Sequence, residues 1–265
     1  MAKDEGFRSI ANDQRGRAAL LLEGLLPAGG FRDRLAKGAA DAGRQVIIPE
    51  KDPRSPQELK DLTPRLLQYL KDHKVRSLVL VGTSLGGAAA LYFIYRLREE
   101  GKVHTVEGLN TIVSPFGLDD LSRRVKLMRG VGQAVRRLAP QQGEAFLKRV
   151  FPKLEILTNA EAILQMLEAE RRKQITGTPV LAVTTRVSDL KHPFIHSDWI
   201  IHHGDAIKSL RARFKNVEDF TVAPEPVIGP RGINLVAGHY LNHDESARVS
   251  RRIDAFLRNP RIKTK

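Results

Sequence analysis

The segment that decides the fold spans residues 78–87 and reads Leu78-Val79-Leu80-Val81-Gly82-Thr83-Ser84-Leu85-Gly86-Gly87. Its first four residues are apolar, which predicts a strand buried on both faces of a parallel sheet. An alanine-rich stretch from about Leu85 to Glu99 follows at once and predicts a helix. Gly82, Ser84 and Gly86 together match the pattern G-x-S-x-G. We therefore expect Ser84 on a tight turn between this strand and this helix.

Such a turn explains why glycines flank Ser84. It strains the backbone of its central residue, and glycines two positions before and after that residue avoid clashes with neighbouring elements. The helix that follows places the positive end of its dipole at the Ser84 hydroxyl. An incidental serine in a glycine-rich turn is the alternative interpretation. The strand before the motif and the helix after it argue against that alternative.

Strand and helix patterns alternate on both sides of this turn. Before it we predict a strand over residues 18–25, a helix over 31–42, a strand over 45–49 and a helix that Ser55 opens. After it we predict strands within 103–114, over 179–185 and over 219–223, with helices over 205–214 and 245–257. This alternation is typical of an α/β fold with a mainly parallel sheet flanked by helices.

Residues 116–177 show no strand pattern, and their apolar residues recur at helical spacing. This segment is therefore expected to be a helical insertion. The predicted organisation is an N-terminal segment (1–17), a core formed by 18–115 and 178–265, and the insertion (116–177).

The composition of the 265 residues suits one domain, with 42% apolar residues and no cysteine. Apolar runs are too short to span a membrane, and residues 1–16 are polar and charged, so we expect neither a span nor a secretory signal. The absence of cysteine excludes disulfides and thiolate catalysis, and it fits a reducing, cytoplasmic location. Forty-four Lys and Arg against thirty Asp and Glu give a formal charge of +14, which favours anionic partners.

With the Ser84 motif in this context, the chain resembles the α/β-hydrolase superfamily from about Ala18 to Leu257. In that family the nucleophile, the acid and the histidine of the catalytic triad follow in this order, and a glycine-histidine pair precedes the last helix. Gly238-His239 resembles that pair. The resemblance implies that His239 takes the proton of Ser84 and returns it to the leaving group. An ordinary loop histidine is the alternative.

The family's acid follows the penultimate core strand, and Asp189 is the first carboxylate after the strand predicted at 179–185. The resemblance gives it the task of orienting the imidazole of His239. Asp198 is the second candidate. A capping or surface role for both aspartates is the remaining interpretation.

The oxyanion hole of this family uses the backbone N–H after the nucleophile, here that of Leu85, and a second one from the loop after an earlier strand. Leu25 is the candidate for the second donor. Relatives commonly have histidine-glycine before it, whereas this chain has Glu23-Gly24. A carboxylate beside a developing oxyanion is unexpected, so Glu23 turns away, pairs with a basic group, or impairs activity.

The apolar faces of the insertion need a surface to cover, and the rim of the sheet around Ser84 is the large uncommitted one. We therefore expect a lid that walls the substrate pocket with Leu118, Leu121, Val125 and Met128. No cofactor is expected. The histidines and aspartates between His192 and Asp205 fit no standard ligand spacing, so no metal site is expected either.

Basic residues gather in three groups, at 123–137, 171–173 and 248–265. The first is interleaved with apolar residues and reads as an amphipathic basic helix that can touch an anionic lipid surface or an acidic substrate. A solvated face is the plainer interpretation. No zinc finger, RNA-binding sheet motif or basic heptad region accompanies the charge, so nucleic-acid binding is not favoured.

Three hypotheses follow. The leading one is a serine hydrolase that cleaves a small-molecule carboxylic ester or thioester through an acyl-enzyme on Ser84. The second is a catalytically silent binding protein with the same fold. The third is an acyl hydrolase that docks on lipid through a basic lid.

Overall fold

The computed structural model describes residues 6–10, 16–24, 31–102, 105–121, 154–170, 174–185, 201, 203–222, 228–229, 232–233 and 243–261. Among these residues, none of the helices is both long and apolar enough to cross a membrane.

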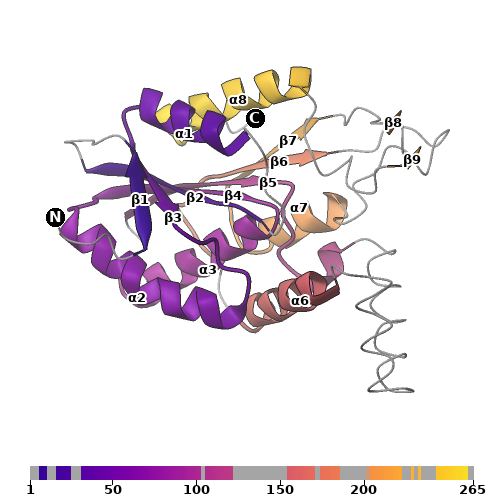
Figure 1. Cartoon of the computed structure of the whole chain (residues 1–265), viewed down its shortest axis with the longest axis horizontal. Coiled ribbons are helices and arrows are strands. Elements are labelled where there is room, and N and C mark those ends of the chain that lie inside the picture. The colour runs from indigo at the N-terminus through magenta and orange to yellow at the C-terminus, as the bar shows by residue number, and fades with distance from the viewer. Residues whose placement is uncertain are drawn as a thin grey trace.

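A seven-stranded sheet forms the centre of the molecule (Figure 1). Its strands are β1 (Phe7–Ile10), β2 (Arg17–Leu22), β3 (Gln45–Pro49), β4 (Ser77–Thr83), β5 (Val106–Ile112), β6 (Val180–Thr185) and β7 (Val217–Val222). They lie in the order β1-β3-β2-β4-β5-β6-β7, and only the edge strand β1 runs antiparallel to its neighbour. The predicted α/β fold with a mainly parallel sheet is therefore confirmed. A small hairpin of β8 (Ile228–Gly229) and β9 (Gly232–Ile233) lies apart from this sheet.

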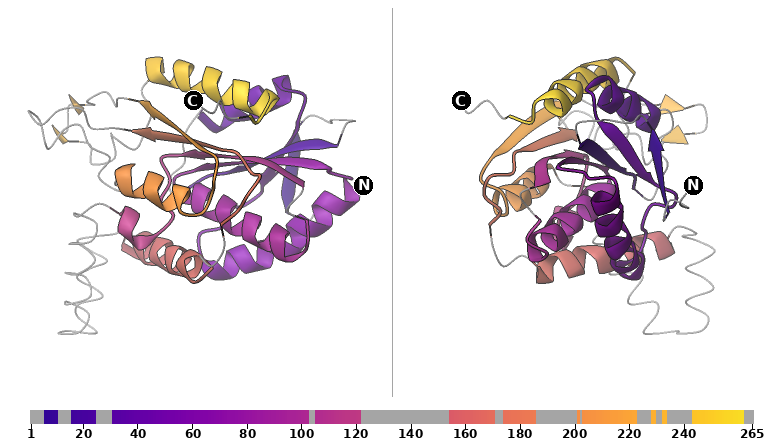
Figure 2. Two further views of the ribbon diagram at one scale, coloured as in Figure 1. Left: turned by 180° about the vertical axis from the view of Figure 1, so that it is seen from behind. Right: turned by 90° about the vertical axis from the view of Figure 1, so that its left-hand side faces the viewer.

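Helices cover both faces of the sheet, which gives three layers (Figure 2). One layer holds α1 (Phe31–Asp41) and α8 (His243–Arg258), which contact each other. The opposite layer holds α2 (Pro56–Asp72), α3 (Leu85–Glu99), α6 (Leu154–Ala169) and α7 (His203–Arg211). Such two-sided cover explains why β2 and β4 read as continuous apolar runs.

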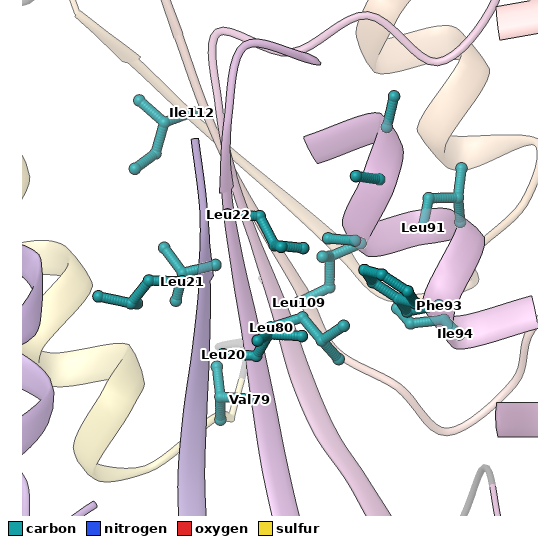
Figure 3. Packing of buried hydrophobic residues seen from close by; sticks show 14 of the residues in the cluster. Leu20, Leu21, Leu22, Val79, Leu80, Leu91, Phe93, Ile94, Leu109 and Ile112 are labelled. Carbon is teal, nitrogen blue, oxygen red and sulfur yellow. The ribbon is translucent and has the colours of Figure 1, made fainter. Parts of the chain in front are cut away.

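The core consists of the central strands and the helices beside them. Leu21 and Leu22, successive residues of β2, point to opposite faces of the sheet (Figure 3). On the side of Leu22, side chains of α3 such as Phe93 complete the packing, and all three residues are almost fully buried. Strand β4 and helix α3 are therefore fixed on both sides of the turn that joins them.

A local signal places the start of helix α2 where the sequence predicts it. Helix α2 begins at Pro56 after Ser55, whose hydroxyl accepts a hydrogen bond from the Glu58 N–H at 3.2 Å. Proline suits the first helical position because its missing N–H would have no partner there. Helix α2 continues through Pro64 and ends at Asp72.

Strand β1 was not predicted from the sequence, and the predicted insertion is described only in part. Strand β1 lies in the N-terminal segment, where only Phe7 of its four residues is buried, so it has no alternating pattern to detect. Within the predicted insertion, the described parts are residues 116–121 with a short 3-10 helix, η2 (Leu118–Asp120), residues 154–170 with the helix α6, and residues 174–177. Helix α6 contacts α3, α2 and η2. The stretches 122–153 and 171–173 lie outside the described residues, so the lid remains a prediction.

Candidate active site at the Ser84 turn

Ser84 stands alone between the last residue of β4, Thr83, and the first residue of α3, Leu85. Its backbone has φ 54° and ψ −128°, a conformation that a residue with a side chain rarely adopts. The Ser84 N–H donates to the carbonyl of Ile112 at 2.8 Å, and the Ser84 carbonyl accepts from the Gly87 N–H at 3.0 Å. Its side chain makes no capping hydrogen bond to α3. The half-buried hydroxyl is therefore not used to cap the helix that it precedes.

Three glycines allow the backbone to close tightly around Ser84. A Cβ atom at Gly82 would lie 2.4 Å from the carbonyl oxygen of Gly86, and one at Gly86 would lie 2.2 Å from the carbonyl oxygen of Leu22. A Cβ atom at Gly24 would lie 2.6 Å from the Cβ of Ser84. Larger residues would clash at all three positions. The predicted reason for the flanking glycines is confirmed, and the end of β2 directly adjoins Ser84.

The end of β5 supports the same turn from the other side. Val113 has φ 47°, an outlier for a β-branched residue, and its N–H donates to the Val183 carbonyl at 2.8 Å. The buried Ser114 hydroxyl lies 3.1 Å from the Ile112 carbonyl and 3.3 Å from the Gly82 carbonyl, and its one proton can be donated to either. The backbone of the Ser84 turn is thus held by strands β2 and β5, on both sides of β4.

Glu23, the carboxylate that is unexpected beside an oxyanion hole, is paired with a basic group. Its Oε2 lies 3.2 Å from Nη1 of Arg32, and the same nitrogen lies 3.1 Å from Oδ2 of Asp52. The backbone N–H of Glu23 donates to Oδ1 of Asp52 at 2.9 Å. Of the three alternatives left by the sequence, pairing with a cation is the one observed.

Burial dominates the electrostatics of this group. It raises the pKa of Asp52 and the pKa of Glu23, because a carboxylate loses hydration inside the protein. The positive charge of Arg32 opposes both shifts. Sequence reasoning did not single out Arg32 or Asp52. The available signal was that Asp52 follows a buried strand by three residues, at the edge of the sheet where ligands of parallel α/β proteins bind.

Asp120 is a second buried carboxylate near the ends of the strands, and its side chain is committed to structural contacts. It accepts hydrogen bonds from the Phe116 N–H at 2.6 Å and from the Ser209 hydroxyl at 2.5 Å. Arg213 reaches the carbonyls of Phe116 and Ser209, at 2.9 and 2.8 Å. Burial raises the pKa of Asp120, against the effect of these donors and of Arg213. The group joins the loop after β5 to α7.

The predicted site residues fall into two groups. Ser84 and Leu85 form the turn, and Leu118 and Leu121 lie at η2, where Leu121 forms an antiparallel bridge with Ile201. The others lie outside the described residues: Leu25, Val125, Met128, Asp189, Asp198 and His239.

The register of the sheet shows at which edge of the sheet the segment after β6 begins. Thr83 is paired with Ile112, and Ile112 is paired with Val183, so these three residues lie level across β4, β5 and β6. Parallel strands end at the same edge of a sheet. The segment after Thr185, which carries Asp189, therefore starts from the edge at which Ser84 lies.

Of the residues considered as metal ligands, His203 and Asp205 are described, and both lie in the first turn of α7. His203 Nε2 is 3.4 Å from Oδ2 of Asp219. Within the described ranges there is no cluster of three histidine, aspartate or glutamate side chains that could hold a metal ion.

No model of a protein family and no curated protein sequence matches the chain. Among solved structures, it is similar to a monoacylglycerol lipase from Paleococcus ferrophilus, with a TM-score of 0.57 and 15% identity over 95% of this chain and 97% of the other.

Two further structures are similar to the same extent. A putative aryl esterase from Burkholderia cenocepacia gives a TM-score of 0.55 and 15% identity, over 95% of this chain and 93% of the other. A haloalkane dehalogenase from Agrobacterium tumefaciens C58 gives 0.54 and 15% identity, over 95% and 91% of the two chains. At identities this low, the structural likeness establishes a shared fold alone. The names of the three proteins describe different reactions.

Proposed function

Because the chain has the α/β-hydrolase fold, we propose that it is a serine hydrolase that cleaves a carboxylic ester or thioester through an acyl-enzyme on Ser84. The observation that carries the proposal is the Ser84 turn itself. A non-glycine residue with φ 54° costs free energy, and such strain gathers at functional sites. The Ser84 hydroxyl, directly after β4, makes no capping hydrogen bond to α3, so it is available to attack a substrate.

In the proposed reaction, the Ser84 oxygen attacks the acyl carbon while His239 takes the hydroxyl proton. The carbonyl oxygen becomes an oxyanion that the N–H groups of Leu85 and Leu25 stabilise. Collapse of this intermediate breaks the bond to the alcohol or thiol, which leaves with the proton from His239. Water then attacks the acyl-enzyme by the same steps, releases the acid and restores Ser84.

Asp189 is proposed to hold His239 in the tautomer that accepts the proton, and Asp198 is the second candidate. The position of Asp189, four residues after the end of β6, supports the choice because β6 ends at the edge of the sheet at which Ser84 lies. Asp120, a buried carboxylate after β5, already accepts hydrogen bonds from its own donors.

The proposed substrate is a small acyl ester or thioester, and the lipase and esterase names of two similar structures support this class. The proposed acyl pocket is lined by Leu118, Leu121, Val125 and Met128. Docking of a basic lid on anionic lipid stays a prediction, because residues 123–137 lie outside the described residues.

A catalytically silent protein is the alternative that the Glu23 carboxylate first suggested. The ion pair between Glu23 and Arg32 weakens that argument, since it places a positive charge against the carboxylate. The Ser84 strain also has no use in a purely binding protein, and a glycine at position 84 would avoid it.

The test is covalent labelling with a fluorophosphonate, which reacts with activated serines. The full-length protein should take up one label, at Ser84, and should hydrolyse p-nitrophenyl esters from a panel of increasing chain length. Ser84→Ala should lose both properties. Equal labelling of Ser84→Ala and the unaltered protein would refute the assignment of the nucleophile.

A further inference from the structure

We propose that Glu23, Arg32 and Asp52 form a positioning group that fixes the end of β2 against Ser84 and thereby sets the geometry of the oxyanion hole. The inference rests on the proposed function, and it adds three residues that act through the backbone. They come from three places in the fold: the end of β2, the first turn of α1 and the loop after β3.

The contacts of the positioning group link each member to the other two, and Arg32 also donates to the Pro49 carbonyl at 3.5 Å. Asp52 uses Oδ1 to accept the backbone N–H of Glu23 at 2.9 Å, and it uses Oδ2 to bind Nη1 of Arg32 at 3.1 Å. That nitrogen also binds Oε2 of Glu23 at 3.2 Å. Glu23 is therefore held at its backbone by Asp52 and at its side chain by Arg32, so its position is determined twice.

The residue after Glu23 touches the proposed nucleophile. A Cβ atom at Gly24 would lie 2.9 Å from Oγ of Ser84 and 3.0 Å from the Thr83 carbonyl. Two residues before Gly24, the carbonyl of Leu22 faces Gly86 in the first turn of α3. A small displacement of Glu23 would therefore move the backbone that borders Ser84 and leads into Leu25.

The charges of the positioning group make its geometry depend on all three members. Two carboxylates share one guanidinium, and the three side chains are only 11% to 19% exposed. Asp33 and Arg54 also act on the two carboxylates, Asp33 raising the pKa of Glu23 and Arg54 lowering the pKa of Asp52. Without Arg32, the two buried carboxylates would repel each other.

A buried ion pair is weak support for stability, because apolar residues of similar volume often serve as well. Three charges that hold the residue before Gly24 have a clearer use in orientation, because Gly24 borders Ser84. An oxyanion donor must lie about 2.7–3.1 Å from the oxygen it stabilises, and removing one donor costs roughly 10²–10³ in kcat. Loosening the strand end should cost part of that factor.

The experiment compares Asp52→Ala with Glu58→Ala. Glu58 is a matched control because it also accepts a backbone N–H, that of Arg54, and also binds a cation, Lys51. Asp52→Ala should lower kcat for an activated p-nitrophenyl ester by about 10- to 100-fold with KM within about 2-fold. Glu58→Ala should leave both constants near their original values.

Rescue by a conservative change separates positioning from stability. Asp52→Asn keeps an oxygen that can accept the Glu23 N–H, so it should retain more of kcat than Asp52→Ala. Arg32→Lys should retain more of kcat than Arg32→Met, because it keeps a positive charge for both carboxylates. The proposal would be overturned if the loss of kcat followed thermal stability alone. In that case Asp52→Ala and Glu58→Ala would lose the same share of kcat when their stabilities are equal.

Hydrogen exchange gives a readout that needs no catalysis. Asp52→Ala should speed amide exchange in the segment that contains Glu23, and Glu58→Ala should not. If the unaltered protein takes no label and hydrolyses no ester, the proposed function fails, and the exchange result still tests the positioning group. Unchanged exchange at Glu23 in folded Asp52→Ala would refute it.

Discussion

The turn at Ser84 and the junction at Asp120 follow neighbouring strands of one sheet, and they treat a polar side chain in opposite ways. Ser84 has a strained backbone and a hydroxyl that caps nothing in α3. Asp120 is fully buried, and it accepts hydrogen bonds from a backbone amide and a hydroxyl with Arg213 nearby. The Ser84 hydroxyl is therefore left without a capping role on a strained backbone, whereas the Asp120 carboxyl has hydrogen-bond partners in the surrounding protein.

This difference shows which kind of observation marks a functional residue. A carboxyl with a raised pKa near the strand ends is a reasonable candidate for a catalytic group. The partners of Asp120 explain its burial without any reaction, since they tie the loop after β5 to α7. Ser84 has no comparable structural explanation, because glycine would fit the same backbone conformation with less strain.

The largest expected effect tests whether Asp120 or Asp189 supports catalysis. Asp189→Asn should lower kcat for a p-nitrophenyl ester by about 10⁴-fold, the loss expected when the histidine takes the wrong tautomer. Asp120→Asn and Asp198→Asn should change kcat by less than about 10-fold. Steady-state kinetics on folded protein measures all three. A 10⁴-fold loss in Asp120→Asn with full activity in Asp189→Asn would reverse the comparison.

The next effect is on stability at the Asp120 junction. Asp120→Ala should lower the free energy of unfolding by about 3 kcal/mol, because it leaves a buried amide and a hydroxyl without their acceptor and removes the negative charge near Arg213. Urea unfolding followed by circular dichroism measures the change. Asp119→Ala is the control, since this neighbour is exposed. Equal free energies of unfolding for the two variants would show that the Asp120 junction does not stabilise the fold.

Strain at Ser84 predicts a smaller gain. Ser84→Gly should raise the free energy of unfolding by about 1 kcal/mol, because glycine adopts positive φ without a steric cost. Ser84→Ala keeps the Cβ atom and should change stability less. Both variants should fail to take up fluorophosphonate. If Ser84→Gly is no more stable than Ser84→Ala, the backbone at this turn is not strained.

The smallest effect concerns pH. Burial raises the pKa of Asp120, so the folded protein binds a proton there more readily than the unfolded chain. Its contribution to stability is complete below the ordinary pKa and is lost as the pH rises through the raised value. The stability advantage of the unaltered protein over Asp120→Asn should therefore shrink as the pH rises above the ordinary aspartate pKa of about 4. Unfolding at several pH values tests this, and a growing advantage would contradict it.

Local sequence signals predicted the order of the main strands and helices and the turn that carries Ser84. Both depend on patterns within about twenty residues, such as the apolar run of β4 and the glycines beside Ser84. Strand β1 was missed because a short edge strand with one buried residue has no periodic pattern.

The positioning group could not be predicted because its members meet only in the folded chain. Glu23 and Asp52 are 29 residues apart, and Arg32 lies on the helix between them. Sequence alone left three alternatives for Glu23, and the contact with Arg32 selected one. The acid, the histidine and the lid stay predictions, since Asp189, His239 and residues 122–153 lie outside the described residues.

The close contact between Leu22 and Gly86 has a consequence for how such a sequence can change over evolutionary time. It joins two segments more than sixty positions apart through backbone atoms, so no compensating side-chain change can make room for a methyl group at Gly86. The same holds at Gly82, whose neighbours are backbone atoms of the same turn. Substitutions can accumulate on the solvent-facing sides of the helices, whereas Gly82 and Gly86 must stay glycine. The solved structures that share only 15% identity with this chain are similar to it in fold.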